Sequence, residues 1–318
     1  MRIHQMRGIT VRILGLLPFF VLINACSPTP STPVPPQISI SAVTEIPLTA
    51  TAIPSTAKQV EVTSAPLPME DTLPSEIGLD PANWMAWPEV PIVTQQMRDV
   101  YLLGQSLGND PHAFSILGDC QSTPETFLGL YEDLTELAAL PVDLQETAFY
   151  FSDSLSRLSP TAKSGTTSGA LLWVEWHEGK YSCSNTKTPL DCELRLNKPS
   201  FALVTVGTHW EARNERYMRK IIEQLLAQGV VPILSTKADN REGDHGINAE
   251  TALLAAEYGL PLWNYWPVTE DLPNRGLYTK KGNEFLGDIY LTDEALDLHR
   301  YSALQALDAV WRAVTGEQ

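Results

Sequence analysis

Short apolar runs that alternate with helix-like patterns are the feature that most constrains this chain. Four of these runs have the length of a buried strand. They are AFSILGD (113–119), FALVTVGT (201–208), VVPILSTK (230–237) and PLWNYW (261–266). Continuous apolar strands between amphipathic helices are typical of a parallel sheet that is covered by helices on both faces. The sequence therefore predicts an α/β fold with a parallel sheet.

A helix is predicted after three of these runs and again near the end of the chain. After the first run, Ser122 and Glu125 have the spacing of a capping box and Pro124 lies in the first turn, which predicts a helix over STPETFLGLYEDL. The other predicted helices are ERYMRKIIEQLLAQG, which ends at Gly229, then NAETALLAAEYG, and a last one from about His299 to Val314.

Polar and reactive residues follow the predicted strands. Ligands of parallel α/β sheets bind at the carboxyl ends of the strands. The three ends concerned are Gly118-Asp119-Cys120, Gly207-Thr208-His209 and Ser235-Thr236-Lys237. We expect these three ends to contribute to one site.

The first 26 residues indicate export from the cytoplasm. Three arginines precede an apolar stretch (13–23) that is too short to span a bilayer comfortably. LINAC resembles a bacterial lipobox, which makes Cys26 the expected lipidation site and the membrane an expected partner through a lipid anchor. The alternative is an ordinary signal peptide cleaved near Ala25. Both interpretations place the chain outside the cytoplasm.

Composition divides the rest of the chain into two parts. Residues 27–75 are rich in Pro, Ser and Thr with almost no aromatic residues, which predicts a disordered tether. Residues 76–318 contain all eight tryptophans and are long enough to form one large domain. The formal net charge of −16 argues against nucleic acid or anionic lipid headgroups as partners.

The cysteines of the domain fall into two groups. Cys183 and Cys192 are nine residues apart and flank a polar loop, so in an exported protein we predict a disulfide between them. Cys120 is then left unpaired. It could be a nucleophile, a metal ligand or a small buried apolar residue.

The order of the strand ends resembles that of the SGNH, or GDSL-like, hydrolase superfamily of esterases and acyl hydrolases. The corresponding blocks of this chain are Gly118-Asp119-Cys120, then Gly165, then Gly207-Thr208-His209-Trp210, and finally GDIYLT, where Tyr290 stands in place of a histidine. The run TPLDCELRLNKPSFALVTVGT resembles a branch of this superfamily found in exported bacterial proteins. The resemblance implies a flavodoxin-like, three-layer α/β/α fold.

The same resemblance implies a degenerate catalytic set. In the superfamily a serine attacks an ester carbonyl, a histidine takes its proton, and backbone N–H groups with an Asn side chain bind the oxyanion. Here Cys120, Gly165 and His209 would supply the oxyanion donors, but Cys120 and Tyr290 replace the serine and the histidine. A thiol needs a nearby base or cation to ionise near neutral pH, and tyrosine is a poor proton acceptor. Hydrolysis is therefore expected to be weak or lost.

Two functions remain open. The first is a binding protein that uses the old cleft for an ester-bearing or carbohydrate ligand, with Asp119 and Trp210 as contributors. The second is an active ester or acyl hydrolase in which Cys120 is the nucleophile and a relocated histidine is the base. His209 is one candidate for that base, and His299 is another, although its place at the start of the last predicted helix favours solvent exposure.

The sequence does not favour two further roles. Ser122 could replace the serine nucleophile, but its capping-box position accounts for it. Cys120, His209, Asp239, Asp244 and His245 could converge on a metal, yet their spacing fits no known metal motif. We therefore expect neither a metal nor a cofactor.

Overall fold

The computed structural model describes residues 73–209 and 211–317. The expected signal segment (1–26), Cys26 and Trp210 lie outside these residues, as does the predicted tether up to residue 72. None of the helices in the described part is long and apolar enough to cross a membrane.

The centre of the fold is a parallel sheet. Its four strands lie in the order β1 (Asp110–Gly118), β2 (Pro199–Thr205), β3 (Val231–Ser235) and β4 (Leu262–Trp263). An isolated parallel bridge joins Gly118 to Ala162 and adds a short fifth segment beside β1. Numbered along the chain, these five segments lie in the order 2-1-3-4-5, which is the flavodoxin-like order. The predicted α/β fold with a parallel sheet is confirmed.

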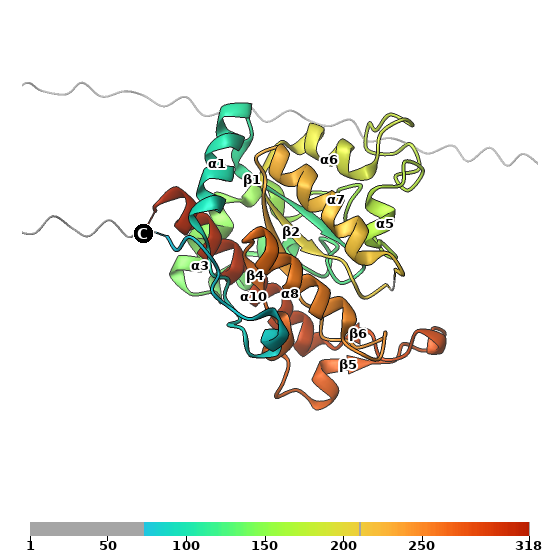
Figure 1. The fold of residues 1–318 in the computed structure, drawn as a ribbon. Helices are drawn as coiled ribbons and strands as arrows, with labels where there is room; N and C mark the ends of the chain where they lie inside the picture. Colours follow the sequence, from blue (N-terminus) through green and yellow to red (C-terminus); the bar gives the residue numbers. More distant parts are fainter. Residues whose placement is uncertain (1–72, 210, 318) are drawn as a thin grey trace, which may run out of the picture. The chain divides into compact units, whose positions relative to one another are not determined.

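Helices cover both faces of this sheet (Figure 1). One layer contains α1 (Gln95–Leu107), α3 (Val142–Tyr150) and α10 (Asp293–Thr315), and the other contains α6 (Pro189–Asn197), α7 (Asn214–Ala227) and α8 (Gly246–Tyr258). Successive side chains of a strand point to opposite faces of the sheet, so each strand contacts both helix layers. Phe114 on β1 packs against Phe151 on the α10 side, whereas the next residue, Ser115, donates a 2.5 Å hydrogen bond to Glu193 of α6.

Short elements complete the described chain. The 3-10 helices are η1 (Pro81–Ala86), η2 (Leu128–Glu132), η3 (Pro273–Gly276) and η4 (Glu284–Leu286), and the short α-helices are α2 (Leu134–Ala138), α4 (Ser152–Leu155), α5 (Ser168–Leu171) and α9 (Tyr265–Val268). Strands β5 (Leu277–Tyr278) and β6 (Tyr290–Leu291) form a separate antiparallel pair. Figure 1 shows this pair beyond the end of α8.

The segment after β1 is not the predicted helix. Residues 120–127 form turns and bends, and between residues 120 and 133 the only helical structure is η2. Ser122 does not cap a helix, because its hydroxyl is hydrogen-bonded to Thr205 Oγ1 of β2 at 2.7 Å. A Cβ on Gly118 would lie 2.4 Å from that same Thr205 Oγ1, so glycine is required where the chain leaves β1. The Ser122 hydroxyl thus bonds to a residue distant in sequence and not to the backbone of a local helix.

The last helix begins earlier than predicted. Thr292 caps α10 by accepting a hydrogen bond from the backbone N–H of Ala295. His299 therefore lies within the helix, is only 3% exposed, and contacts the rings of Phe127 and Trp263. The expectation that His299 faces solvent is wrong.

The structure contains the disulfide between Cys183 and Cys192 that was predicted from their spacing. Cys192 lies in α6, and Cys183 lies in the loop before it. The disulfide closes this loop onto α6.

Candidate functional site

Cys120 lies at the point where the strand order of the sheet reverses. The end of β1 has β2 on one side and the segment around Ala162 on the other. In open α/β sheets this reversal opens a crevice at the carboxyl ends of the strands, where ligands bind. Cys120 is a free, half-buried cysteine just beyond this end.

The surroundings of the Cys120 thiol oppose its ionisation. Burial is the main cause that raises the pKa of Cys120, to about 11, and the nearby charge of Asp119 adds to the rise. Lys280 and a hydrogen bond from Ser164 lower this pKa only in part. Among the described residues, no histidine nitrogen is hydrogen-bonded to the thiol: His112, His177 and His245 bond elsewhere, and the buried His209 Nε2 and His299 Nδ1 have no partner.

Asp119 is a buried carboxyl group at the same strand end, only 1% exposed. Its Oδ1 accepts a 3.0 Å hydrogen bond from the backbone N–H of Gln121, whereas Oδ2 has no hydrogen-bond partner among the described residues. Burial raises the pKa of Asp119 to about 7, and the charge of Asp239 contributes to the rise. A carboxyl group of this kind is largely protonated below neutral pH and can then donate a hydrogen bond.

His209 lies just beyond the end of β2, as predicted. Gly207 has φ +146°, and a Cβ there would lie 2.9 Å from Ile247 Cγ2, so the chain needs glycine to turn before His209. Burial lowers the pKa of His209, and the positive charge of Arg241 lowers it further. The imidazole is therefore neutral at pH 7 and can act as a hydrogen-bond donor.

The other two predicted positions, Gly165 and Tyr290, are brought to the same edge of the sheet by two different segments of the chain. Gly165, with φ +83°, follows the short segment that pairs with β1, and its neighbour Ser164 contacts the Cys120 thiol. Tyr290 begins β6, and its hydroxyl accepts a 2.7 Å hydrogen bond from Asn283. The loop before Tyr290 reaches the Cys120 turn, because Gln121 Nε2 donates a 2.6 Å hydrogen bond to the carbonyl of Ile289.

Lys237, at the end of β3, is bound within the protein. Its ammonium donates to Asp239 Oδ1 at 2.7 Å and to Glu242 Oε2 at 2.6 Å, and all three side chains are buried. Asp239 is therefore engaged with a cation. In the described part of the chain, no cluster of three or more His, Cys, Asp or Glu side chains is arranged to hold a metal ion.

A cavity of about 490 Å³ lies beside this edge, between the loop after β3 and the β5–β6 region. We call it the rim cavity. Its lining residues are Ala238, Asn240, Arg241, Trp266, Asn274, Arg275, Leu277, Leu286, Gly287, Asp288 and Ile289. Among the described residues, none of those predicted for chemistry lines it. Its arginines were missed because each lies in a loop, DNREGDHG or PNRG, whose polar composition is that of an ordinary turn.

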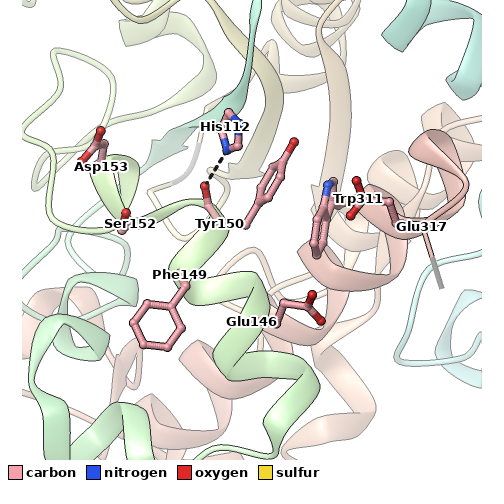
Figure 2. Close-up of a pocket in the computed structure, with 8 residues that line it drawn as sticks. All are labelled: His112, Glu146, Phe149, Tyr150, Ser152, Asp153, Trp311 and Glu317. Carbon is pink, nitrogen blue, oxygen red and sulfur yellow. Dashed lines mark hydrogen bonds between the residues drawn. The ribbon is translucent and has the colours of Figure 1, made fainter. Parts of the chain in front are cut away.

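A second cavity, of about 450 Å³, lies near the amino end of β1 (Figure 2). His112 Nδ1 lies 3.2 Å from the carbonyl oxygen of Tyr150, and the centres of the two tilted rings are 4.1 Å apart. The carboxyl ends of the strands are at the other edge of the sheet, so this cavity is separate from the candidate site.

No protein-family profile and no curated protein sequence matches the chain. Among solved structures, the chain is similar to a GDSL-like lipase from Bacteroides thetaiotaomicron VPI-5482, with 15% sequence identity and a TM-score of 0.40. The match covers 66% of this chain and 96% of the lipase chain. At this TM-score the likeness by itself assigns neither an activity nor a ligand.

Proposed function

We propose that this protein is a lipid-anchored, extracytoplasmic, hydrolase-like protein that binds an ester-bearing or carbohydrate ligand and hydrolyses esters weakly or not at all. The observation that carries this proposal is the state of Cys120, a half-buried thiol beside a buried carboxyl group, to which no histidine of the described residues is hydrogen-bonded.

The thiol is poorly prepared to act as a nucleophile. With a pKa of about 11, roughly one thiol in ten thousand is ionised at pH 7. A neighbouring histidine would normally remove the proton, but the imidazoles of the described residues are bonded elsewhere or have a buried nitrogen without a partner. Asp119 adds negative charge beside the thiol and so opposes the thiolate further.

The donors for a carbonyl oxygen remain. The backbone N–H groups of Cys120 and Gly165 make no backbone hydrogen bond to another described residue. His209, neutral and with Nε2 unpartnered, could supply a third donor. A site with donors but no activated nucleophile favours binding over turnover.

The test is hydrolysis of p-nitrophenyl acetate and butyrate by the full-length protein in detergent micelles. We expect rates close to that of buffer, and no change in the Cys120→Ala variant. A rate well above buffer that Cys120→Ala abolishes would contradict the proposal.

The second candidate is a hydrolase with Cys120 as nucleophile and His209 as a relocated base. The unpartnered Nε2 of His209 at the neighbouring strand end favours it. In that case Cys120→Ala and His209→Ala would each abolish the hydrolysis. His299→Ala would not, because His299 lies between aromatic rings in the core.

The lipid anchor needs a separate test, because Cys26 lies outside the described residues. We expect the full-length protein to incorporate labelled palmitate when it is expressed in bacteria. The Cys26→Ala variant should incorporate none, and equal labelling of the two proteins would exclude Cys26 as the lipidation site.

A further inference from the structure

The rim cavity contains two arginines that form no ion pair with a described acidic side chain, although the charge of Glu270 acts on Arg275 from a greater distance. Neither Arg241 nor Arg275 forms an ion pair with a described residue, although acidic residues outnumber basic ones by 38 to 22 in the whole chain. Arg241 is exposed, and its guanidinium makes no hydrogen bond to a described residue. In such an acidic protein, two guanidinium groups on one cavity that have no ion-pair partner among the described residues indicate a site for a negative charge.

Arg275 is held in place by its neighbours. Its guanidinium carbon lies 3.6 Å from the centre of the Trp266 ring, and Nη1 donates a 2.6 Å hydrogen bond to the carbonyl of Trp266. Stacking on tryptophan fixes the plane of the guanidinium and leaves its other N–H groups available.

Asp288, the acidic residue in the lining, is hydrogen-bonded to two other side chains. Asp288 Oδ2 accepts a 3.1 Å hydrogen bond from Asn274 Nδ2, and Oδ1 accepts one from the hydroxyl of Thr279. Asp288 is therefore held by two neutral donors and forms no ion pair with either arginine, although its carboxyl group remains part of the lining.

The backbone at Arg275 is strained. Asn274 and Arg275 have φ values of +49° and +54°, a region that non-glycine residues rarely adopt. Such strain is found where the surroundings hold a functional geometry. Here the strained pair places the Asn274 amide and the Arg275 guanidinium on the same cavity.

We propose that the rim cavity binds the oxyanion of a small organic anion, a carboxylate or a phosphate, between Arg241 and Arg275. The apolar part of the anion would contact Leu277, Leu286 and Ile289, which also line the cavity. This inference rests on the proposed ligand-binding function and adds the charge of the ligand. The carbonyl of Ile289 accepts the hydrogen bond from Gln121, which connects this wall to the Cys120 turn.

Isothermal titration of the full-length protein with three probes of one size tests this assignment. The probes are benzoate, phenyl phosphate and the neutral benzamide. We expect at least one of the two anions to bind at least tenfold more tightly than benzamide, and the stronger of the two identifies the carboxylate or the phosphate as the preferred group. Raising the salt concentration from 50 to 300 mM should weaken the binding, as for other charge-dependent contacts between exposed groups.

Arginine variants provide the residue-level test. Arg241→Ala should weaken the binding of the preferred anion at least tenfold and leave the melting temperature unchanged, because the side chain is exposed and unbonded. Arg275→Ala should weaken binding as much but also uncovers Trp266, so its melting temperature is measured in parallel. Arg216→Ala is the matched control, since Arg216 is exposed on α7 and does not line the cavity.

Three outcomes would overturn the assignment: no binding of either anion, equal affinity for benzamide and the anions, or unchanged affinity in Arg241→Ala. These outcomes differ from failure of the proposed function. Rapid, Cys120-dependent ester hydrolysis would refute the binding role and leave the anion measurements as they are.

Discussion

Replacing Asp119 by asparagine is expected to stabilise the protein, and by an amount that depends on pH. The asparagine keeps the size of the side chain and an oxygen that can accept the hydrogen bond from Gln121 N–H. It removes the need to ionise a group that is only 1% exposed. The variant therefore isolates the free energy associated with the buried charge.

The magnitude follows from the pKa of Asp119, which rises from 3.8 to about 7 on folding. Between these two values the unfolded chain loses the proton while the folded chain retains it, so the stability of the wild type falls as pH rises from 3.8 to 7. The full effect is about 4 kcal/mol above pH 7, and about 2 kcal/mol is present at pH 5.5. Below pH 3.8 this contribution vanishes.

Urea denaturation at pH 5.5 and pH 8, followed by far-UV circular dichroism, measures the difference. We expect Asp119→Asn to exceed the wild type in free energy of unfolding by about 2 kcal/mol at pH 5.5 and by about 4 kcal/mol at pH 8. Asp271→Asn, which makes the same charge change at an exposed position, should stay within about 0.5 kcal/mol of the wild type at both pH values. A gain that is the same at both pH values, or a loss at pH 8, would refute the reasoning.

Three further predictions concern other buried groups. Iodoacetamide should alkylate Cys120 at pH 8 about a hundredfold more slowly than an unperturbed thiol, because the pKa of Cys120 rises from 9.0 to about 11, and unfolding in urea should remove the difference; fast alkylation of the folded protein would contradict this. Lys237→Met leaves Asp239 and Glu242 buried without their cation and should lower the free energy of unfolding by about 3–5 kcal/mol in a urea titration. Burial lowers the pKa of His299 to about 3, so the wild type should lose about 1.4 kcal/mol of stability per pH unit as pH falls from 6.5 toward 3. His299→Phe should not show this loss, and parallel pH profiles of the two proteins would exclude a neutral, buried imidazole.

The sheet could be predicted because buried parallel strands have a simple sequence pattern. β3 lies within its predicted apolar run, and β1 and β2 overlap theirs but begin a few residues earlier. The runs are found because a strand covered on both faces needs apolar residues at nearly every buried position. Helices α7 and α8 also lie where the helical patterns were found.

The errors arose where a contact distant in sequence decided the structure. Ser122 was assigned to a helix cap from its local spacing, but Thr205 on β2 bonds its hydroxyl. His299 was expected at the surface, but Ala295 and Ser302 lie on the same face of α10 as His299 and are also buried. Because this face carries small and polar residues, a pattern based on large apolar side chains does not identify it as buried.

The rim cavity could not be predicted from sequence, because its two arginines come from loops more than thirty residues apart. Neither loop carries a motif, and only the fold brings them to one cavity. The strand-end positions Cys120 and His209 were found in advance because the topology of a parallel sheet assigns them to one edge.

The buried contacts of Lys237 have a consequence for the loop that carries Arg241. Asp239 and Glu242 flank Arg241 in the sequence, and both are held by the same ammonium group. The residues on either side of Arg241 are thus fastened to one buried ammonium group, whereas the Arg241 side chain is exposed. Binding of an anion would then reduce the conformational entropy of one side chain and not that of a whole loop. A preorganised site of this kind can bind a small molecule through few contacts.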